Sequence, residues 1–231
     1  MLKKNDFIEL EFTGKVKDGE IFDTNVKDKA KELNLELDAK PFILCIGQNM
    51  ILPPLDKDLE GKEIGKHYSI EIKAKEACGL RDKNLVKTIP LRVFLEQKIN
   101  PYPGLVLNMD GMIVRIAAVS GGRVIADFNN PLAGKDVVYD FKILKKIETL
   151  DEKIKAIMSF LLRKEFEFKV EGNKLTIEAS EPEQKYISLF KDKFKEMLDL
   201  DLDFKLHEHK KEKEEKAEKK EEKKASKDEK A

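Results

Sequence analysis

Few side chains of this chain could act as a nucleophile, a base or a metal ligand. There are three histidines and two cysteines, and their spacing matches no nucleophile–histidine–acid set, zinc motif or phosphate-binding glycine loop. His207 and His209 could hold a metal weakly, but the charged segment that follows them favours solvated side chains. Cys78 could be a reactive thiol, although it has no neighbouring base and a packed structural role is favoured. We expect neither a metal nor a cofactor.

One acid, Asp23, is accompanied by aromatic residues from several parts of the chain. Phe22 precedes it, and Phe12, Phe42 and Tyr139 lie on segments with a strand pattern. Aromatic residues on alternating strands are usually core residues, and an aspartate here could simply hydrogen-bond the backbone of a turn. The alternative is an apolar pocket around a single carboxylate, which suits chemistry that depends on removing water rather than on a nucleophile.

The elements that would position these residues form one small-domain pattern in two pieces. Alternating or buried apolar runs predict strands, and a short helix is expected over 55–60. The pairs Thr13–Gly14 and Asp18–Gly19 predict turns, and residues 25–39 could form a surface helix or a loop. The predicted strands are 7–12, 41–46, 68–74 and 137–143. Because the last strand comes long after the others, another module must be inserted before it.

The inserted module, residues 84–129, has the pattern of a compact β domain. Short strand-like runs, including one at Val93–Phe94, are separated by glycine and proline. Met109 and Met112 flank Gly111 on a hairpin-like turn. They could be core residues, or they could form an adaptable surface for unfolded chains, since methionine fits many partners.

A third region follows the closing strand. Helical spacing of apolar residues predicts one helix over 151–163 and another over 182–198, with a hairpin centred on 171–173 between them. A unit of this size buries little surface alone, so we expect it to self-associate or to dock on a neighbour. Residues 207–231 are almost entirely charged, which predicts a disordered tail.

The composition excludes several classes of protein. Lys+Arg and Asp+Glu both number 45 in 231 residues, so no net positive field attracts nucleic acid. No apolar run is long enough to span a bilayer, and the start of the chain has no secretory or transit pattern. Two cysteines far apart favour a reducing compartment. We expect a cytoplasmic protein without nucleic-acid or membrane partners.

The order of the motifs resembles a known family. The motifs are Phe12–Gly14, Asp18–Gly19, Phe22–Asp23, Pro41–Phe42, Gly47, the glycines of 59–65, Ala77–Gly79 and Tyr139–Lys142. Together, over about residues 5–147, they resemble the FKBP family of peptidyl-prolyl cis-trans isomerases. The position of the insert resembles the SlyD-like branch, which carries an insert-in-flap domain. A further α/β domain and a charged tail are similar to long-chain archaeal members.

The resemblance implies an α+β fold, in which a half-wrapped antiparallel sheet packs on a short helix. Residues 1–83 and 130–147 would form this isomerase domain, and residues 84–129 would form a small inserted β domain with a chaperone role. Residues 148–206 would form a C-terminal α-β-β-α domain that pairs two copies, before the tail at 207–231.

The resemblance also assigns the site. Phe12, Asp23, Phe42 and Tyr139 would be catalytic, and the Leu52 backbone N–H would bind the substrate carbonyl. Two positions depart from the common pattern: Leu55 stands where many relatives have tryptophan, and Cys78 stands where a tyrosine hydroxyl usually binds the substrate. The positions implied to bind substrate are Phe22, Ile51, Leu52, Leu55, Cys78 and Leu132.

We therefore expect a prolyl isomerase with chaperone activity, whose substrates are unfolded or partly folded proteins with X–Pro bonds. The alternative is a non-catalytic holdase that binds unfolded chains through the insert, an interpretation favoured by Cys78. A metal-handling protein is a weaker third hypothesis, because the tail is not rich in histidine and cysteine.

Overall fold

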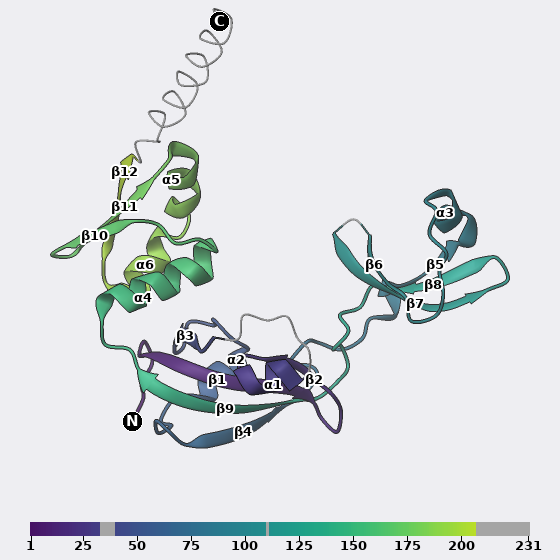
Figure 1. The fold of residues 1–231 in the computed structure, drawn as a ribbon, viewed down its shortest axis with the longest axis horizontal. Helices are drawn as coiled ribbons and strands as arrows, with labels where there is room; N and C mark the ends of the chain where they lie inside the picture. Colours follow the sequence, from purple (N-terminus) through teal and green to yellow (C-terminus); the bar gives the residue numbers. More distant parts are fainter. Residues whose placement is uncertain (33–39, 110, 207–231) are drawn as a thin grey trace, which may run out of the picture.

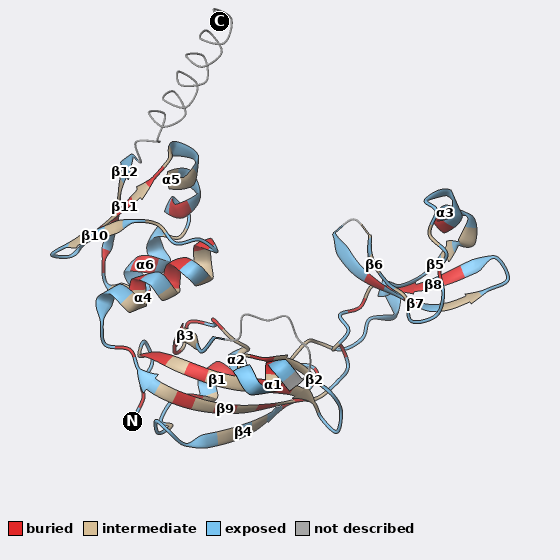
Figure 2. Ribbon diagram, in the orientation of Figure 1, coloured by how far each residue is buried: buried red, intermediate tan, exposed pale blue. Residues whose placement is uncertain are grey.

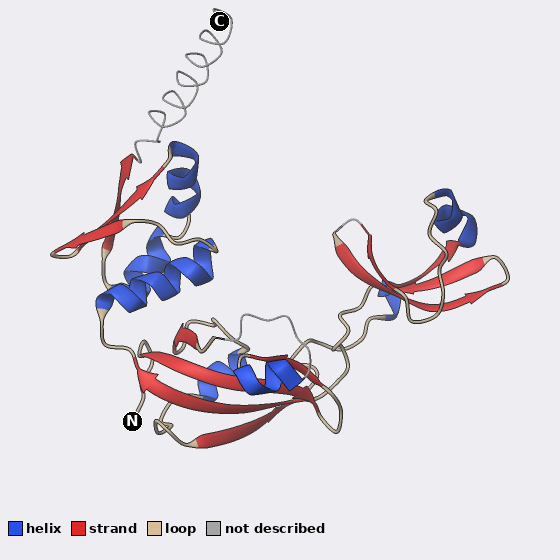
Figure 3. Cartoon of the chain, in the orientation of Figure 1, coloured by secondary structure: helices blue, strands red, loops and turns tan. Residues whose placement is uncertain are grey.

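The computed structural model describes residues 1–32, 40–109 and 111–206, which form three separate sheets (Figure 1). The first sheet belongs to residues on both sides of the insert, the second lies within the insert, and the third lies in the C-terminal domain (Figure 3). The name insert is kept here for residues 84–129, and the name C-terminal domain for residues 148–206. The predicted tail lies outside the described residues.

The first sheet is antiparallel throughout, in the order β2-β1-β9-β4, with β3 pairing along β1. The predicted strands are confirmed, and burial alternates along β9, whose Val137, Tyr139, Phe141 and Ile143 are buried on one face. Its strands are β1 (Phe7–Val16), β2 (Ile21–Thr24), β3 (Phe42–Cys45), β4 (His67–Ile72) and β9 (Val137–Lys146). The late strand β9 occupies a central position between β1 and β4.

Two short helices accompany this sheet. Helix α2 (Pro53–Asp58) begins slightly earlier than predicted, because proline is tolerated in the first turn of a helix. Within the stretch 25–39, a surface helix α1 (Lys27–Glu32) is present, and residues 33–39 lie outside the described residues. The turn predicted at Thr13–Gly14 is wrong: both residues lie within β1, next to a bulge between Gly14 and Lys15.

The insert contains a four-stranded antiparallel sheet in the order β5-β8-β7-β6. The strand-like run at Val93–Phe94 is instead part of helix α3 (Leu91–Glu96), which presents Phe94 to the core. A short apolar run does not distinguish a strand from a helix by periodicity. The remaining elements are the 3₁₀ turn η1 (Lys83–Leu85), β5 (Val86–Pro90), β6 (Val106–Met109), β7 (Met112–Ser120) and β8 (Arg123–Asp127).

The C-terminal domain differs from the predicted α-β-β-α order. The hairpin is confirmed as β10 (Phe168–Glu171) and β11 (Lys174–Ala179). The second helix is divided into α5 (Glu181–Ser188) and α6 (Lys191–Leu198), and a final strand β12 (Asp201–Leu206) runs parallel to β11. The first helix, α4 (Leu150–Ile157), continues into a π-helical turn, η2 (Met158–Leu162).

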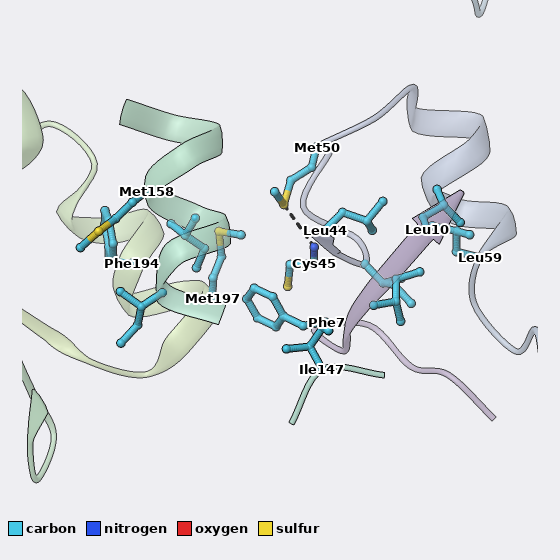
Figure 4. Close-up of a cluster of buried hydrophobic side chains, with 14 of the residues drawn as sticks. Phe7, Leu10, Leu44, Cys45, Met50, Leu59, Ile147, Met158, Phe194 and Met197 are labelled. Atoms are coloured by element: carbon cyan, nitrogen blue, oxygen red, sulfur yellow. Dashed lines mark hydrogen bonds between the residues drawn. The ribbon is translucent and has the colours of Figure 1, made fainter. Parts of the chain in front are cut away.

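The buried side chains form two apolar cores (Figure 2). The smaller core lies inside the insert and contains Phe94, Val114, Ile116, Val124 and Ala126. The larger core runs without a break from the first sheet into the C-terminal domain. Figure 4 shows Phe7, Cys45, Met50 and Ile147 on one side and Met158, Phe194 and Met197 on the other. The C-terminal domain therefore buries its apolar surface by docking on the domain that contains the first sheet. No described helix is long and apolar enough to cross a membrane.

Candidate active site

A cavity of about 400 Å³ lies beside the first sheet, between β1, β3, β9 and the start of α2. Seven of the residues that the sequence assigns to the site line it, and five further residues complete the lining. The seven are Phe12, Asp23, Phe42, Ile51, Leu52, Leu55 and Tyr139, and the five are Asn25, Lys40, Met50, Phe160 and Arg163.

The aromatic part of the cavity depends on a close approach at Gly14. The rings of Phe12 and Tyr139 are 5.9 Å apart and tilted by 47°, and Phe22 meets Tyr139 edge-on at the same distance. A Cβ atom at Gly14 would lie 2.9 Å from Phe22 and 3.0 Å from Tyr139. Glycine is therefore required at this position of β1, not for a turn but so that the two rings can pack against the strand.

Asp23 is the one acidic side chain among the described residues that line the cavity. Burial raises the pKa of its carboxyl group, and a hydrogen bond from the Thr24 backbone amide partly offsets this rise. Burial also raises the pKa of Tyr139 to about 12, with smaller contributions from the charges of Asp23 and Cys78. Both shifts have desolvation as the main cause, so the cavity is a place where water solvates charge poorly.

Asn25, which sequence reasoning missed, holds the strand that carries Asp23. Its Oδ1 atom accepts a hydrogen bond from the Phe12 N–H at 2.7 Å, and its Nδ2 atom donates to the Leu10 carbonyl at 2.8 Å. The hydroxyl groups of Thr13 and Thr24 are 3.0 Å apart and buried. These bonds fix Phe12 and Asp23 relative to each other, and an asparagine two residues after an acid gives no distinctive signal in the sequence.

Asp56, a second missed residue, shapes the loop that supplies Ile51 and Leu52. It is only 2% exposed, and its carboxylate accepts hydrogen bonds from the backbone amides of Gly47 and Asn49 at 2.9 and 2.8 Å. The Leu52 carbonyl accepts a hydrogen bond from the Asp56 N–H at 2.9 Å. No described residue accepts a hydrogen bond from the Leu52 N–H, so this donor is available to a ligand in the cavity.

Three of the assigned substrate-binding residues are not among the described residues that line the cavity. Phe22 packs behind Tyr139, and Cys78 is half-buried and near enough to affect the Tyr139 pKa. Leu132 lies in the returning connector, where its N–H donates to the Asn130 side chain. Their contact with a substrate stays a prediction.

The two methionines assigned to a chaperone surface lie in the insert, opposite each other at the ends of β6 and β7. Met109 is half-buried against the core of the insert, and Met112 is 50% exposed. Met109 is therefore placed as expected for a core residue, whereas Met112 is exposed as expected for a surface that binds other chains. The sheet carries further exposed apolar residues that the sequence did not single out: Val106, Ile113 and Ile125.

Phe160 and Arg163 come from the C-terminal domain and were missed. They reach the cavity through the docking of that domain on the first sheet, for which local sequence spacing gives no signal. Within the described residues, no group of three or more His, Cys, Asp or Glu side chains could hold a metal ion. An apolar, poorly hydrated cavity with one acid and one free backbone donor can distort or desolvate a bound group, but it offers no activated nucleophile.

Two family models match the chain. The FKBP-type peptidyl-prolyl cis-trans isomerase model matches residues 1–92. The model described as FKBP26, IF domain, matches residues 87–132, which overlap most of the insert. The two matches overlap at residues 87–92.

Curated relatives agree with both matches. The chain is 27% identical over 146 residues to the short-type peptidyl-prolyl cis-trans isomerase of Methanocaldococcus jannaschii, which covers 62% of this chain and 92% of the relative. It is 26% identical over 147 residues to the FKBP-type isomerase SlyD of Helicobacter pylori, covering 61% and 79%. The corresponding SlyD of Escherichia coli K12 is 27% identical over 111 residues, covering 47% and 57%. The family model and the relatives show that the chain carries an FKBP-type peptidyl-prolyl cis-trans isomerase domain, and the SlyD relatives support its SlyD-like branch.

Proposed function

We propose that this isomerase acts on X–Pro bonds in the cavity around Asp23, and that the insert presents unfolded chains to it. The observation that carries the first half is the combination of a carboxyl group with a raised pKa and an unpaired Leu52 N–H in one apolar cavity. The second half is supported by the exposed apolar residues of the insert.

Desolvation supplies the driving force in this proposal. Amide resonance opposes rotation by ~18–20 kcal/mol, and twisting the bond removes the resonance and reduces the dipole of the C–N unit. A cavity that solvates charge poorly therefore favours the twisted amide over the planar one. An acceleration of ~10³-fold needs only about 4 kcal/mol of such differential stabilisation.

Each lining residue has a role in holding the twisted bond. The Leu52 N–H donates to the carbonyl on one side of the proline, which fixes one end while the other rotates. The edges of the Tyr139 and Phe12 rings face the carbonyl group that rotates. The Asp23 carboxylate provides a fixed negative charge close to the partly positive groups attached to the proline nitrogen. Leu55, 1% exposed, forms the apolar floor beneath the proline ring.

The insert has a surface suited to extended, unfolded chains. In β6 and β7, Val106 and Ile113 are 57% and 59% exposed and lie on the sheet face opposite to the buried Val114. Apolar side chains in solvent at this density are typical of interaction sites. Captured chain would present its X–Pro bonds to the cavity at a raised local concentration.

Cis/trans exchange of a short peptide, followed by two-dimensional NMR, tests the cavity. We expect the wild type to accelerate exchange, and Asp23→Ala and Phe42→Ala to reduce the acceleration strongly. Asp28→Ala, on the exposed face of α1, is the matched control and should leave it unchanged. Suppression of aggregation without acceleration of exchange would instead favour the holdase.

Replacing residues 84–129 by a short flexible linker tests the insert. We expect the rate on a refolding protein to fall by roughly an order of magnitude or more, because the local concentration of substrate is lost, while the rate on a short peptide changes little. The double variant Val106→Ser and Ile113→Ser keeps the insert and should reproduce part of this loss. Equal losses on peptide and protein would reject presentation by the insert.

Pairing of two copies through the C-terminal domain is also part of the proposal. Tyr186 and Leu189, at the end of α5, are 47% and 76% exposed, which supports an apolar contact with a second copy. Sedimentation of the wild type and of Leu189→Glu measures this, since a charge in the contact should shift a dimer to monomer. A wild type that sediments as a monomer would remove this part.

A further inference from the structure

Part of the lining of the isomerase cavity comes from the C-terminal domain and not from the domain that contains the first sheet. Phe160 and Arg163 line the cavity from the C-terminal domain, together with Phe12 and Tyr139 of the first sheet. The two domains share one apolar core, so this part of the lining is held by the same packing that holds the domains together.

The local structure at this part of the lining is unusual. Helix α4 widens into the π-helical turn η2, which ends at Arg163 with a left-handed backbone conformation, φ 55°. Single π-helical turns are rare and frequently occur at functional sites. Here the wider turn carries Phe160 to within 6.4 Å of Phe42, measured between ring centroids.

Arg163 continues the same stack of side chains. Its guanidinium carbon lies 5.9 Å from the centre of the Phe160 ring, in a cation–π arrangement. The cavity is thus lined by two neighbouring aromatic rings, Phe42 and Phe160, followed by the charged guanidinium group of Arg163.

The positive charge of Arg163 is not neutralised within the described part of the chain. Arg163 is exposed and forms no salt bridge with a described residue. It is also absent from the causes of the raised Asp23 pKa, which are burial and the Thr24 amide. A second cation, Lys40, lines the same cavity. The described lining of the cavity therefore combines the acid Asp23 with two cationic side chains, Lys40 and Arg163.

A second cavity of about 380 Å³ shares Lys40 and Phe42 with the first. Its lining also includes Lys155 and Ser159 of α4 and η2, together with the acidic residues Glu152 and Glu165. The two cavities therefore share part of their lining beside the C-terminal domain.

We propose that Phe160 and Arg163 form a subsite that selects X–Pro substrates with an acidic side chain close to the proline. The Phe160 ring contacts the aliphatic stem of the substrate residue, and the guanidinium group pairs with its carboxylate, for which the planar fork of arginine is well suited. This inference rests on the proposed function of the cavity. It makes the C-terminal domain a determinant of specificity as well as a possible contact between copies.

The experiment uses the full-length protein and a peptide series with one X–Pro bond. Glu, Gln or Lys is placed at each of two positions before and after the bond, and exchange rates and peptide binding are both measured by NMR. We expect the wild type to favour Glu over Lys at one position by roughly two- to five-fold, the range of an exposed ion pair. The preference should fall at high salt.

Four variants separate charge from structure. Arg163→Gly suits the left-handed backbone and should abolish the preference, while Arg163→Lys should retain part of it. Arg163→Glu should invert it in favour of Lys. Phe160→Leu keeps an apolar wall but loses the ring, and should weaken binding of all peptides without changing the order of Glu, Gln and Lys. Unchanged amide shifts of the first sheet show that each variant is folded.

The outcomes distinguish this inference from the function on which it rests. Equal acceleration of Glu, Gln and Lys peptides by the wild type would overturn the subsite and leave the isomerase cavity intact. A preference that persists in Arg163→Glu would also overturn it, and would assign the selection to Lys40. If no peptide is accelerated, the cavity proposal fails, and the binding data still decide whether Arg163 discriminates between the peptides.

Discussion

The insert and the C-terminal domain are both attached to the first sheet, but they differ in their peptide connections and in the apolar core that they share with it. The C-terminal domain has a single peptide connection to β9, yet its Met158, Phe194 and Met197 share a core with Phe7 and Cys45 of the sheet. The insert has two peptide connections, one at each end, but keeps a core of its own.

The contacts where the insert joins the sheet are polar. Arg81 pairs with Asp127, and the Asn129 side chain bonds the backbone of Asp82, accepting from its N–H at 2.8 Å and donating to its carbonyl at 3.0 Å. The Gly134 N–H donates to the Gly79 carbonyl at 2.8 Å. These bonds hold the outgoing and returning connectors together.

The difference shows that the buried apolar surface, and not the number of peptide connections, decides whether two domains behave as one. Apolar burial stabilises by about 25 cal/mol per Å², whereas a hydrogen bond contributes about 1 kcal/mol net. The C-terminal domain therefore packs as one unit with the first sheet, whereas the insert folds around a core of its own.

The largest expected effect compares one buried aromatic residue from each core. Phe194→Ala and Phe94→Ala remove rings that are 0% and 1% exposed, and each should cost about 3–5 kcal/mol. We expect Phe194→Ala to weaken hydrogen-exchange protection in β1 and β9 as well as in the C-terminal domain. Phe94→Ala should weaken it only in β7 and β8. If Phe194→Ala leaves β1 and β9 unchanged, the two domains do not share one core.

The thiols provide a second test. Cys45 is fully buried at the shared core, where burial, with smaller contributions from Asp56 and Asp6, raises its pKa to about 12. At pH 8 we expect a thiol reagent to label Cys45 at least about 10³-fold more slowly than half-buried Cys78, because labelling requires the domains to open. Phe194→Ala should speed the labelling of Cys45. Equal labelling rates in the wild type would show that the domains separate readily.

At the polar junction, Asn129→Ala should have a smaller and local effect. The side chain is 7% exposed, and its removal takes the Asn129 partner from the Asp82 N–H and leaves the Asp82 carbonyl only its bond from the Leu85 N–H, at a cost of about 1–3 kcal/mol. We expect faster hydrogen exchange in the two connectors, with the rate of Cys45 labelling unchanged. Asn130→Ala, in an exposed turn, is the control. Faster labelling of Cys45 in Asn129→Ala would contradict the independence of the two attachments.

The smallest expected effect concerns Asp23 and pH. Burial raises the pKa of this carboxyl group in the folded state above its ordinary value, so its contribution to stability is complete below the ordinary value and is lost as pH rises through the folded pKa. Asp23→Asn stays neutral and should remove this loss of stability. At pH 7 the first sheet and the C-terminal domain, which share one core, should therefore become slightly more stable, while isomerase activity falls. Chemical denaturation at pH 3.5 and pH 7 measures the difference, with exposed Asp28→Asn as the control. A stability loss that is equal in wild type and Asp23→Asn would contradict a buried, destabilised carboxylate.

Much of the fold could be predicted because its signals are local. The alternation of Val137, Tyr139, Phe141 and Ile143 predicted β9 directly, and the order of motifs predicted that Phe12, Asp23 and the residues around Leu52 would meet. In the C-terminal domain, Leu202, Phe204 and Leu206 also alternate, but they precede a charged segment and were missed as β12.

The rest of the site depends on contacts between distant residues. Phe160 lines the cavity only because the C-terminal domain docks on the sheet, and no spacing within 151–163 distinguishes it from a core residue. Asp56 could have been read as one more charged residue of a short surface helix, whereas it is buried and binds a loop. Gly14 could have been placed correctly only by knowing that two rings converge on it.

The central place of β9 has a consequence for biosynthesis. This strand pairs with both β1 and β4, yet it emerges from the ribosome only after the entire insert. The insert can complete its own sheet first. The hydrogen bonds between its two connectors then hold β4 and β9 close together, so the entropy cost of closing the long loop between these strands is already met when β9 pairs. A nascent chain would thus carry a folded insert before its first sheet is complete.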